Sequence, residues 1–540
     1  MRVFLVGFLL ALAPLQAGLI AQTEPAEPPT QQFFSPSESP HRTRTRATIE
    51  TAPAQNGRWD LLPTVMPINP VHAALMHTGK VLIVSGSGND PDNKDFMAGV
   101  WDPTTQVIRT FRITWDMFCN GMVILPDGRP FVFGGTLRYD PFLGEPRASA
   151  FDPATETFTD LPNMSGGRWY PTGTVLGDGS VLVYSGLNDT NGGLNRTVEI
   201  WTGARKDPWI PAGTAFPSLE FYPREHLLPD GKVFESGWNI ESQLYDPTRH
   251  TFTAVARTRL NQRRIYGTSV LLPLTLAENY KPRVMILGGF PGLPNQIPAA
   301  TNTTELIDLS VPSPQWVNGP PMTEARVQLN ATLLPDGKVL VSGGSQVDED
   351  NASAVKAAEL YDPKSNTFSP ASTMEVPRLY HSNTLLLPDA TVVAVGGNPM
   401  RKVYQPEIEV YSPPYLFDEH GNPARRPVIT HVPAGEIHYG ASFRVSTPDA
   451  DGIRSVVLMR PGAATHAFDM EQRLVELSFT MDSGRSYLRV EAPATGNLAP
   501  PGYYLLFILD EKGVPSVAKF VHLTPGKQGK VHRKKHHSGY

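Results

Sequence analysis

The chain of 540 residues contains a single cysteine, Cys119. With one thiol it can form no internal disulfide, so a packed core or bound groups have to stabilise it. A lone cysteine is either a small buried hydrophobic residue or a residue with chemistry of its own. Composition alone leaves both interpretations open.

An excess of charge of either sign is also missing, as is a long apolar run beyond the N-terminus. The 47 basic and 52 acidic side chains leave a formal net charge of −5, which argues against nucleic-acid binding. Residues 1–21 resemble a signal peptide: Arg2 is basic, residues 3–15 are apolar, and small residues follow at Ala17, Gly18 and Ala21. We therefore expect a secreted, extracellular protein without a membrane span, with an uncleaved anchor as the alternative.

Two further segments have the composition of solvated chain. Residues 22–55 are rich in Pro, Glu, Ser and Thr, which is typical of a linker. Residues 526–540 form a basic tail of Lys, Arg and His, for which binding of a polyanion is an alternative to a simple solvated end.

One pattern recurs seven times at a spacing of about 50 residues, near the length of kelch-type repeats. Each copy has a turn, mostly of Asp-Gly type, then a run of apolar residues that is typical of a strand buried on both faces. The copies are HTGKVLIVSG (77–86), PDGRPFVFGG (126–135), GDGSVLVYSG (177–186), PDGKVFESGW (229–238), KPRVMILGG (281–289), PDGKVLVSGG (335–344) and PDATVVAVGG (388–397).

Four segments between these copies join an aromatic strand end to an Asp-Pro turn, and we interpret them as outer hairpins of four-stranded blades. A ring of blades leaves only short, protected strand edges, which suits a long all-β chain. The sequence thus predicts an all-β fold with a seven-bladed kelch-type β-propeller over residues 56–415. The segments are WDPTTQVI (101–108), FDPATETF (151–158), YDPTRHTF (245–252) and YDPKSNTF (361–368).

The repeats end near residue 415, and longer apolar strands follow, such as SVVLMR (455–460) and YYLLFILD (503–510). Their length and spacing predict a separate immunoglobulin-like β-sandwich domain over residues 416–525.

The repeat frame also aligns residues that are far apart in the sequence. Nine positions before the glycine of an Asp-Gly turn stand Cys119, Tyr170 and Tyr222; in the seventh copy, the same count leads to His381, which Tyr380 precedes. Equivalent positions of a ring are related by its axis, so we expect these side chains to converge on the central channel.

Thiol, phenol and imidazole groups form an unusual set for a packed core. Phenolate and imidazole ligands suit a transition metal, and copper(II) is the obvious candidate. His466, in PGAATHAFDMEQR (461–473), is a candidate for a further nitrogen ligand if the sandwich caps the channel. Each residue taken alone is more often a packing residue, which is how we interpret Tyr222, whereas Arg224 and His226 are candidates for substrate contacts.

Four segments, in this order and at this spacing, resemble the galactose oxidase and glyoxal oxidase family of copper radical oxidases. They are FCNGMVILPDGR (118–129), RWYPTGTVLGDGSVLVYSG (168–186), RLYHSNTLLLPD (378–389) and ATHAFDMEQR (464–473). The resemblance spans roughly residues 56–522. It implies a propeller followed by an immunoglobulin-like domain whose histidine loop enters the channel.

The resemblance also implies a role for each matching residue. A thioether would join Cys119 to the ring of Tyr170, giving a protein-derived Cys-Tyr radical cofactor. One copper ion per chain would be bound by Tyr170, His381 and His466 in its equatorial plane and by Tyr380 axially. Tyr380 would accept the proton of the substrate hydroxyl.

One departure from the family bears on the substrate. Galactose oxidase carries a tryptophan over its thioether, and the matching position here is Asn188, in a loop without tryptophan. This favours small aldehydes such as glyoxal, or simple primary alcohols, over galactose. We therefore expect an oxidase that acts on a small-molecule alcohol or aldehyde and reduces O2 to H2O2. The alternative is a catalytically silent kelch-type propeller that binds proteins or extracellular, cell-wall glycans.

Overall fold

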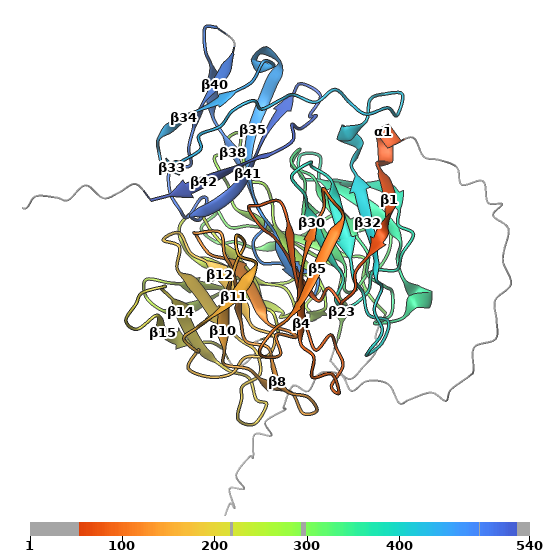
Figure 1. Cartoon of the computed structure of the whole chain (residues 1–540), viewed down its shortest axis with the longest axis vertical. Helices are drawn as coiled ribbons and strands as arrows, with labels where there is room; N and C mark the ends of the chain where they lie inside the picture. The colour runs from red at the N-terminus through yellow and green to blue at the C-terminus, as the bar shows by residue number, and fades with distance from the viewer. Residues whose placement is uncertain (1–52, 217–219, 293–298, 485, 526–540) are drawn as a thin grey trace, which may run out of the picture.

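The computed structural model describes residues 53–216, 220–292, 299–484 and 486–525 (Figure 1). Antiparallel strands dominate it, and no helix among these residues is long and apolar enough to cross a membrane. The proposed signal peptide (1–21) and basic tail (526–540) lie outside the described residues. So does the linker up to residue 52, whereas residues 53–55 belong to helix α1 (Pro53–Asn56). The 3-10 turns are Asn351–Ser353, Pro414–Leu416 and Ala450–Gly452.

Seven antiparallel sheets of the described chain share one plan, with four strands from the inside outward. The last of them takes its outer strand from the N-terminus, because β1 pairs with β32. From inner to outer strand, the sheets are β2 (His72–Leu75), β3 (Val81–Gly86), β4 (Met97–Asp102) and β5 (Val107–Arg112); β6 (Gly121–Ile124), β7 (Pro130–Phe133), β10 (Ala148–Asp152) and β11 (Thr157–Leu161); β12 (Thr172–Val175), β13 (Val181–Tyr184), β14 (Thr197–Trp201) and β15 (Trp209–Thr214); β16 (Arg224–Leu227), β17 (Val233–Ser236), β18 (Glu241–Asp246) and β19 (Thr251–Arg257); β21 (Thr268–Leu271), β22 (Arg283–Leu287), β24 (Thr304–Asp308) and β25 (Trp316–Asn318); β26 (Asn330–Leu333), β27 (Val339–Ser342), β28 (Ala357–Asp362) and β29 (Thr367–Thr373); and β30 (Asn383–Leu386), β31 (Val392–Val395), β32 (Glu407–Ser412) and β1 (Arg58–Val65).

The innermost strands form a closed cycle of contacts. β2 contacts β6, β6 contacts β12, and the series continues through β16, β21, β26 and β30 back to β2. The seven strands therefore surround a common axis, and residues at their ends lie close together although they are up to several hundred positions apart in sequence.

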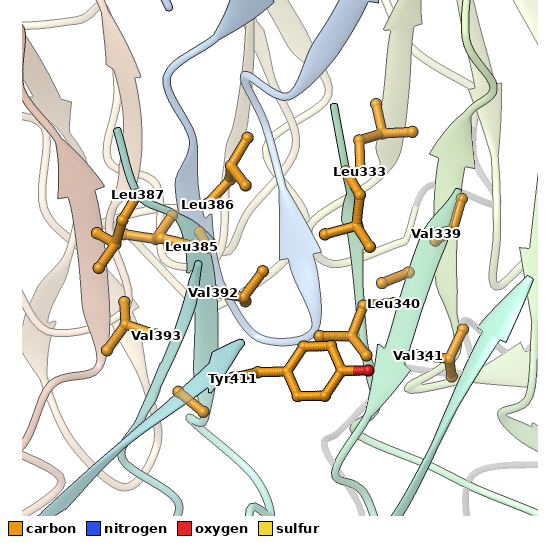
Figure 2. Close-up of a cluster of buried hydrophobic side chains, with 14 of the residues drawn as sticks. Leu333, Val339, Leu340, Val341, Leu385, Leu386, Leu387, Val392, Val393 and Tyr411 are labelled. Atoms are coloured by element: carbon orange, nitrogen blue, oxygen red, sulfur yellow. The ribbon is translucent and has the colours of Figure 1, made fainter. Parts of the chain in front are cut away.

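Burial follows from this arrangement. All residues of β26, β27, β30 and β31 are buried, because neighbouring sheets cover both faces of an inner strand. Figure 2 shows Leu333, Leu340 and Val392 filling the space between two such sheets. The outer strands β5 and β11 are only partly buried, as expected at the rim.

The two turn types have local causes. Gly128 and Gly179 take φ values of +87° and +90° in their Asp-Gly turns, a region where a side chain is disfavoured. The Asp-Pro segments form the turns between third and fourth strands, as the sequence predicts. In the first of them the carboxylate of Asp102 accepts the backbone N–H of Thr104 at 2.9 Å, which fixes the turn.

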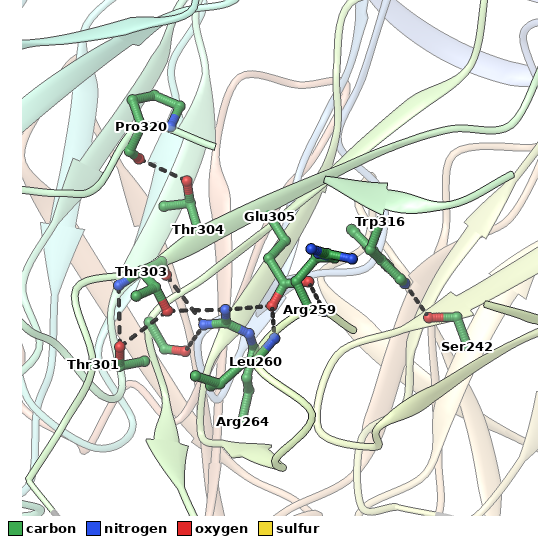
Figure 3. Close-up of polar contacts among 11 residues, drawn as sticks. Ser242, Arg259, Leu260, Arg264, Thr301, Thr303, Thr304, Glu305, Trp316 and Pro320 are labelled. Atoms are coloured by element: carbon green, nitrogen blue, oxygen red, sulfur yellow. Dashed lines mark hydrogen bonds and ion pairs between the residues drawn. The ribbon is translucent and has the colours of Figure 1, made fainter. Parts of the chain in front are cut away.

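Buried arginine–glutamate pairs anchor four of the inner strands. Each arginine precedes an inner strand, and its guanidinium bonds both a glutamate on the third strand and the backbone just after the second; Figure 3 shows Arg264 with Glu305. A buried charge is costly unless paired, so the pairs hold the strand starts in one geometry. They are Arg168–Glu199 (2.7 Å), Arg264–Glu305 (2.8 Å), Arg326–Glu359 (3.0 Å) and Arg378–Glu409 (3.0 Å).

The C-terminal region forms two sheets of its own, drawn in blue in Figure 1. One consists of β33 (Glu436–His438), β42 (Lys519–Thr524), β41 (Gly502–Asp510), β35 (Ile453–Arg460) and β38 (Arg473–Leu477); the other consists of β34 (Ser442–Ser446), β40 (Tyr487–Glu491) and β39 (Phe479–Met481). The remaining short strands are β8 (Thr136–Arg138) with β9 (Leu143–Gly144), and β20 (Arg264–Ile265) with β23 (Phe290–Pro291).

A hairpin between β35 and β38 leaves these sheets and joins the ring. Its strands β36 (Ala463–Thr465) and β37 (Phe468–Asp469) extend the first sheet, because β36 pairs antiparallel with β2. At its base Arg460 pairs with Glu471 and donates to the carbonyl of Ile124 at 2.9 Å. The hairpin is therefore attached to the ring by the pairing of β36 with β2 and, at its base, by the hydrogen bond from Arg460 to Ile124.

Candidate metal centre

Six residues occupy the same place in six of the seven sheets. Each lies two positions before the innermost strand and has a positive φ, which non-glycine residues rarely adopt. The residues, with their φ values, are Cys119 (59°), Tyr170 (70°), Tyr222 (45°), Tyr266 (57°), Gln328 (57°) and His381 (65°). We call them the ring positions.

Backbone hydrogen bonds connect neighbouring ring positions. The N–H of Tyr170 donates to the carbonyl of Cys119 at 3.1 Å, and the N–H of Tyr222 donates to the carbonyl of Tyr170 at 3.0 Å. These bonds satisfy backbone groups that a buried strand start would otherwise leave unpaired. They also place Cys119 and Tyr170 side by side.

Three potential metal ligands converge at one end of the cycle. The sulfur of Cys119 lies 3.6 Å from Nε2 of His466 and 4.0 Å from Nε2 of His381. The ligand atoms of all three residues lie within 4.8 Å of one another, and all three residues are buried. The hairpin loop between β36 and β37 thus brings His466 next to Cys119 and His381, which is the arrangement that the family resemblance implies.

Tyr170 and Tyr380 complete the cluster. Their hydroxyl groups contact each other directly, and the ring of Tyr380 stacks on His381 with centroids 3.7 Å apart. In the other anchored sheets the arginine stands two positions before the ring position, whereas Arg378 stands three before His381. This one additional residue allows Tyr380 and His381 to reach the cluster together.

Both histidines present the same nitrogen to the cluster. Nδ1 of His381 bonds the side-chain oxygen of Asn398 at 2.7 Å, and Nδ1 of His466 bonds Oγ1 of Thr465 at 2.6 Å. Burial lowers the pKa of His381 to about 3 and holds the pKa of His466 well below its usual value, with nearby positive groups adding to the effect on His466. Neutral, oriented imidazoles are what a metal requires.

Arg224 holds the hairpin in place. Its guanidinium donates to the carbonyls of Tyr222 (2.7 Å), Gly267 (2.9 Å) and His466 (3.1 Å). Its two terminal nitrogens thus bond backbone carbonyls and the side chain is buried, so the structure gives it a positioning role instead of the substrate contact expected from sequence. His226 is likewise buried and bonds Ser269 at 2.7 Å.

Tyr222 is a packing residue, as the sequence suggests. Its hydroxyl donates to the carbonyl of Asn120 at 2.7 Å, and its ring lies 4.6 Å from that of His466. His72, which sequence reasoning missed, packs beside the cluster, 6.0 Å from the His466 ring. It is fully buried, and neither of its ring nitrogens has a hydrogen-bond partner among the described residues.

An aromatic ring does cover Tyr170, although Asn188 does not supply it. Trp169 stacks on Tyr170 with centroids 3.8 Å apart and planes inclined by 22°. The side chain of Asn188 instead bonds Asn191 within its own loop. The tryptophan that covers Tyr170 is thus the residue directly before it in the chain and not a residue of the loop that contains Asn188.

The cluster fits a copper ion. Two imidazole nitrogens, two phenol oxygens and a sulfur meet in one buried group, and a nitrogen-and-oxygen set of this kind suits copper(II). The buried carboxylates that calcium or magnesium would require are not part of the set.

Comparisons with known proteins agree with this assignment. Residues 96–415 match the family model described as glyoxal oxidase N-terminus, and residues 426–523 match the galactose oxidase-like early set domain. A galactose oxidase of Gibberella zeae is 28% identical over 508 residues, covering 89% of this chain and 72% of that protein. The aldehyde oxidase GLOX of Vitis pseudoreticulata is 29% identical over 530 residues, covering 87% of this chain and 97% of that protein.

A solved structure is similar over the same extent. It is a fungal alcohol oxidase of the AA5 family in complex with copper, with a TM-score of 0.76 and 26% identity, covering 87% of this chain and 100% of that one. The match to residues 96–415 alone includes more than half of the sequence. By its all-β fold with a C-terminal early-set domain, its donor cluster and these matches, the chain belongs to the galactose oxidase and glyoxal oxidase family of copper radical oxidases.

Proposed function

We propose that this protein is a secreted copper radical oxidase that converts a primary alcohol or small aldehyde to its two-electron oxidation product and reduces O2 to H2O2. The observation that carries the proposal is the convergence of Cys119, His381 and His466 within 4.8 Å, beside the touching hydroxyls of Tyr170 and Tyr380. The closed cycle of inner strands supports the accompanying proposal of a seven-bladed kelch-type propeller, with an immunoglobulin-like sandwich carrying His466.

The proposed metal ligands are Tyr170, Tyr380, His381 and His466. Copper bound there would supply one electron acceptor and make a substrate hydroxyl more acidic. The oxidation requires a second acceptor, which we assign to Tyr170. A thioether to Cys119 would make this phenol easier to oxidise, and the adjacent backbones of the two residues support the cross-link.

The two tyrosines would have separate catalytic roles. Tyr380 would accept the hydroxyl proton of the substrate, and the Tyr170 radical would take a hydrogen atom from the substrate carbon. Two electrons and two protons leave the substrate in total, and O2 takes up both to form H2O2. Trp169, stacked on Tyr170, would shield the radical from solvent.

Substrate choice is the finer part of the proposal. The named relatives include a galactose oxidase and aldehyde oxidases. Tyr170 is covered by Trp169, the residue directly before it in the chain, and Asn188 stands where galactose oxidase has its loop tryptophan. For this reason we propose small aldehydes such as glyoxal, or simple primary alcohols, ahead of galactose as substrates.

Two other functions fit the cluster less well. A silent propeller that binds glycans or proteins would not need five metal and radical donors buried in one cluster. A glycosidase would need paired carboxylates open to a sugar. Glu225 and Glu235 do lie opposite each other on β16 and β17, but both are buried and accept hydrogen bonds from Thr174 and Tyr184.

The experiment that tests the function is a peroxide-release screen on copper-loaded protein in air, with glyoxal, simple primary alcohols and galactose. In the same sample, peptide mass mapping should find the peptides of Cys119 and Tyr170 joined and lighter by two hydrogen atoms. A freely alkylated Cys119 together with no peroxide from any of these substrates would refute the proposal.

A further inference from the structure

A column of aromatic rings leads outward from Tyr170. Trp169 stacks on Tyr170, and Phe142 in turn stacks on Trp169. The centroids of Phe142 and Trp169 are 4.0 Å apart and their planes are inclined by 19°. Tyr139 follows, 5.0 Å from Phe142. Every step is a direct contact between rings, so the column joins the buried radical site to the loop around β8.

A second set of contacts reaches the same tyrosine from the metal side. Phe118 stacks on Tyr139 with centroids 5.7 Å apart and meets His381 edge-on at 5.3 Å. One phenylalanine, Phe142, therefore connects Tyr139 to Trp169, and another, Phe118, connects Tyr139 to the proposed copper ligand His381. Of the rings in this group, Tyr139 and Trp169 are the ones that one-electron oxidants can oxidise readily.

Tyr139 also stands where the column meets solvent. It is half-buried and lines a surface cavity of about 360 Å³ together with Asp116, Lys94 and Arg138. Arg401 lies over the rings of both Tyr139 and Phe142, at 5.9 and 5.8 Å, and an ion pair with Asp140 holds it there. A small molecule in this cavity would contact the phenol edge without reaching the copper site.

The phenol of Tyr139 is held by a hydrogen bond at the wall of this cavity. Its hydroxyl shares a hydrogen bond of 2.7 Å with Oγ of Ser87, whose backbone N–H donates to the buried carboxylate of Asp116 at 2.7 Å. A tyrosine can lose and regain an electron reversibly when its proton can leave and return, and here the cavity gives that proton a route to solvent. The neutral Phe142 has no such chemistry and serves as a bridge.

We infer that Tyr139 is the site at which small one-electron oxidants exchange electrons with the Tyr170 radical cofactor, through Phe142 and Trp169. This inference rests on the proposed function. The oxidant in the cavity removes one electron from Tyr139, which releases its hydroxyl proton to the solvent that the cavity admits. Trp169 returns an electron to Tyr139, which regains its proton, and the Tyr170 phenolate then reduces Trp169. The net reaction leaves the Tyr170 radical and the oxidant reduced by one electron.

This exchange site would serve a need that the proposed chemistry creates. A two-electron oxidase that gains or loses a single electron stops in an inactive state, in which Tyr170 is not a radical. Substrate and O2 cannot correct an odd electron count between them. A path to the surface allows an external one-electron partner to restore the radical without entering the substrate site.

The test measures radical formation directly. Copper-loaded full-length protein that is reduced by one electron relative to the radical state is mixed with hexacyanoferrate(III), and the visible absorption of the tyrosyl radical is followed by stopped flow. We expect Tyr139→Phe and Phe142→Leu to slow the appearance of the radical by about tenfold or more, the effect of ~1.4 kcal/mol on a barrier. Tyr404→Phe is the matched control, because Tyr404 is also a half-buried phenol and its ring stacks on none of the described aromatic residues.

Copper content, cross-link and melting temperature are measured for every variant, so that a damaged site is recognised. Once fully oxidised, Tyr139→Phe should release peroxide at the wild-type rate, since Tyr139 is outside the cluster. Radical formation at the wild-type rate in both Tyr139→Phe and Phe142→Leu would overturn the inference and leave the proposed function standing. If the wild-type protein forms no radical, both the inference about Tyr139 and the proposed function are wrong.

Discussion

Cys119 and Tyr222 occupy equivalent ring positions and are given different roles. Both lie two residues before an inner strand, have a positive φ and are buried. Cys119 points its sulfur at two histidines, whereas Tyr222 bonds a backbone carbonyl and packs against His466. The repeat therefore provides position and backbone geometry, and the side chain at each position decides whether chemistry follows.

Replacing Cys119 should have a large effect on function, because it prevents formation of the cofactor itself. With Cys119→Ser no thioether can form, so Tyr170 remains an ordinary phenol that is harder to oxidise. We expect turnover to fall by at least about 10³-fold, equivalent to ~4 kcal/mol of activation free energy. Peroxide release and peptide mapping check this, with copper content expected to persist through the histidines. A variant that still oxidises substrate at a tenth of the normal rate or better would show that the cross-link is dispensable.

His466 tests the contribution from outside the ring. His466→Ala removes the ligand that the β36–β37 hairpin carries. Loss of a residue that only hydrogen-bonds to a metal ligand lowers metal affinity about 10–100-fold, so we expect loss of the ligand itself to lower copper affinity by more than this. Copper at 100 times its Kd should stabilise the wild-type protein by about 2.7 kcal/mol, and much less of this should remain in the variant. Metal analysis and copper-dependent melting curves measure both.

His226→Gln is the matched control for this experiment, because His226 is a buried histidine on the ring that bonds Ser269 instead of joining the donor cluster. It should bind copper normally. Equal copper affinity in His466→Ala and His226→Gln would contradict the assignment of His466 as a ligand.

Tyr380 should show an intermediate, kinetic effect. Tyr380→Phe keeps the ring that stacks on His381 but removes the hydroxyl that contacts Tyr170. Loss of a general base typically lowers the rate by about 10²–10⁴-fold, while copper and the thioether should remain. Single-turnover measurements on the fully oxidised variant separate this loss from incomplete cofactor formation. Wild-type turnover in this variant would mean that another group accepts the substrate proton.

Much of this arrangement could be predicted from the repeats. Counting back from the Asp-Gly turn identified Cys119, Tyr170 and Tyr222, because the turn and the inner strand have fixed lengths in those copies. The count gives Gln328 as well, from Gly337, but a glutamine carries no signal of metal chemistry. Tyr266 could not be found, because the fifth copy has no Asp-Gly turn and its hairpin between β21 and β22 is longer.

Other features were present in the sequence but had no interpretation before the structure. The segments RWY (168–170), RIY (264–266), RVQ (326–328) and RLYH (378–381) each place an arginine before a ring position, and only the buried glutamate partners explain why. The stacking of Trp169 and the burial of His72 beside the cluster depend on packing between sheets, which no local pattern encodes.

The comparison is sharpest when one change is made at two equivalent positions. Tyr170→Phe and Tyr222→Phe each remove a single hydroxyl from a buried ring position. The first should abolish the radical and the cross-linked cofactor chemistry. The second removes the hydrogen bond to the carbonyl of Asn120 and should destabilise the fold by about 1 kcal/mol. Its ring still packs against His466, so copper, the cross-link and turnover should be retained. Denaturant unfolding and peroxide release, measured side by side, give both numbers. If Tyr222→Phe lost as much activity as Tyr170→Phe, the chemistry would extend to a third ring position, and the division between ligand and packing residues would have to be redrawn.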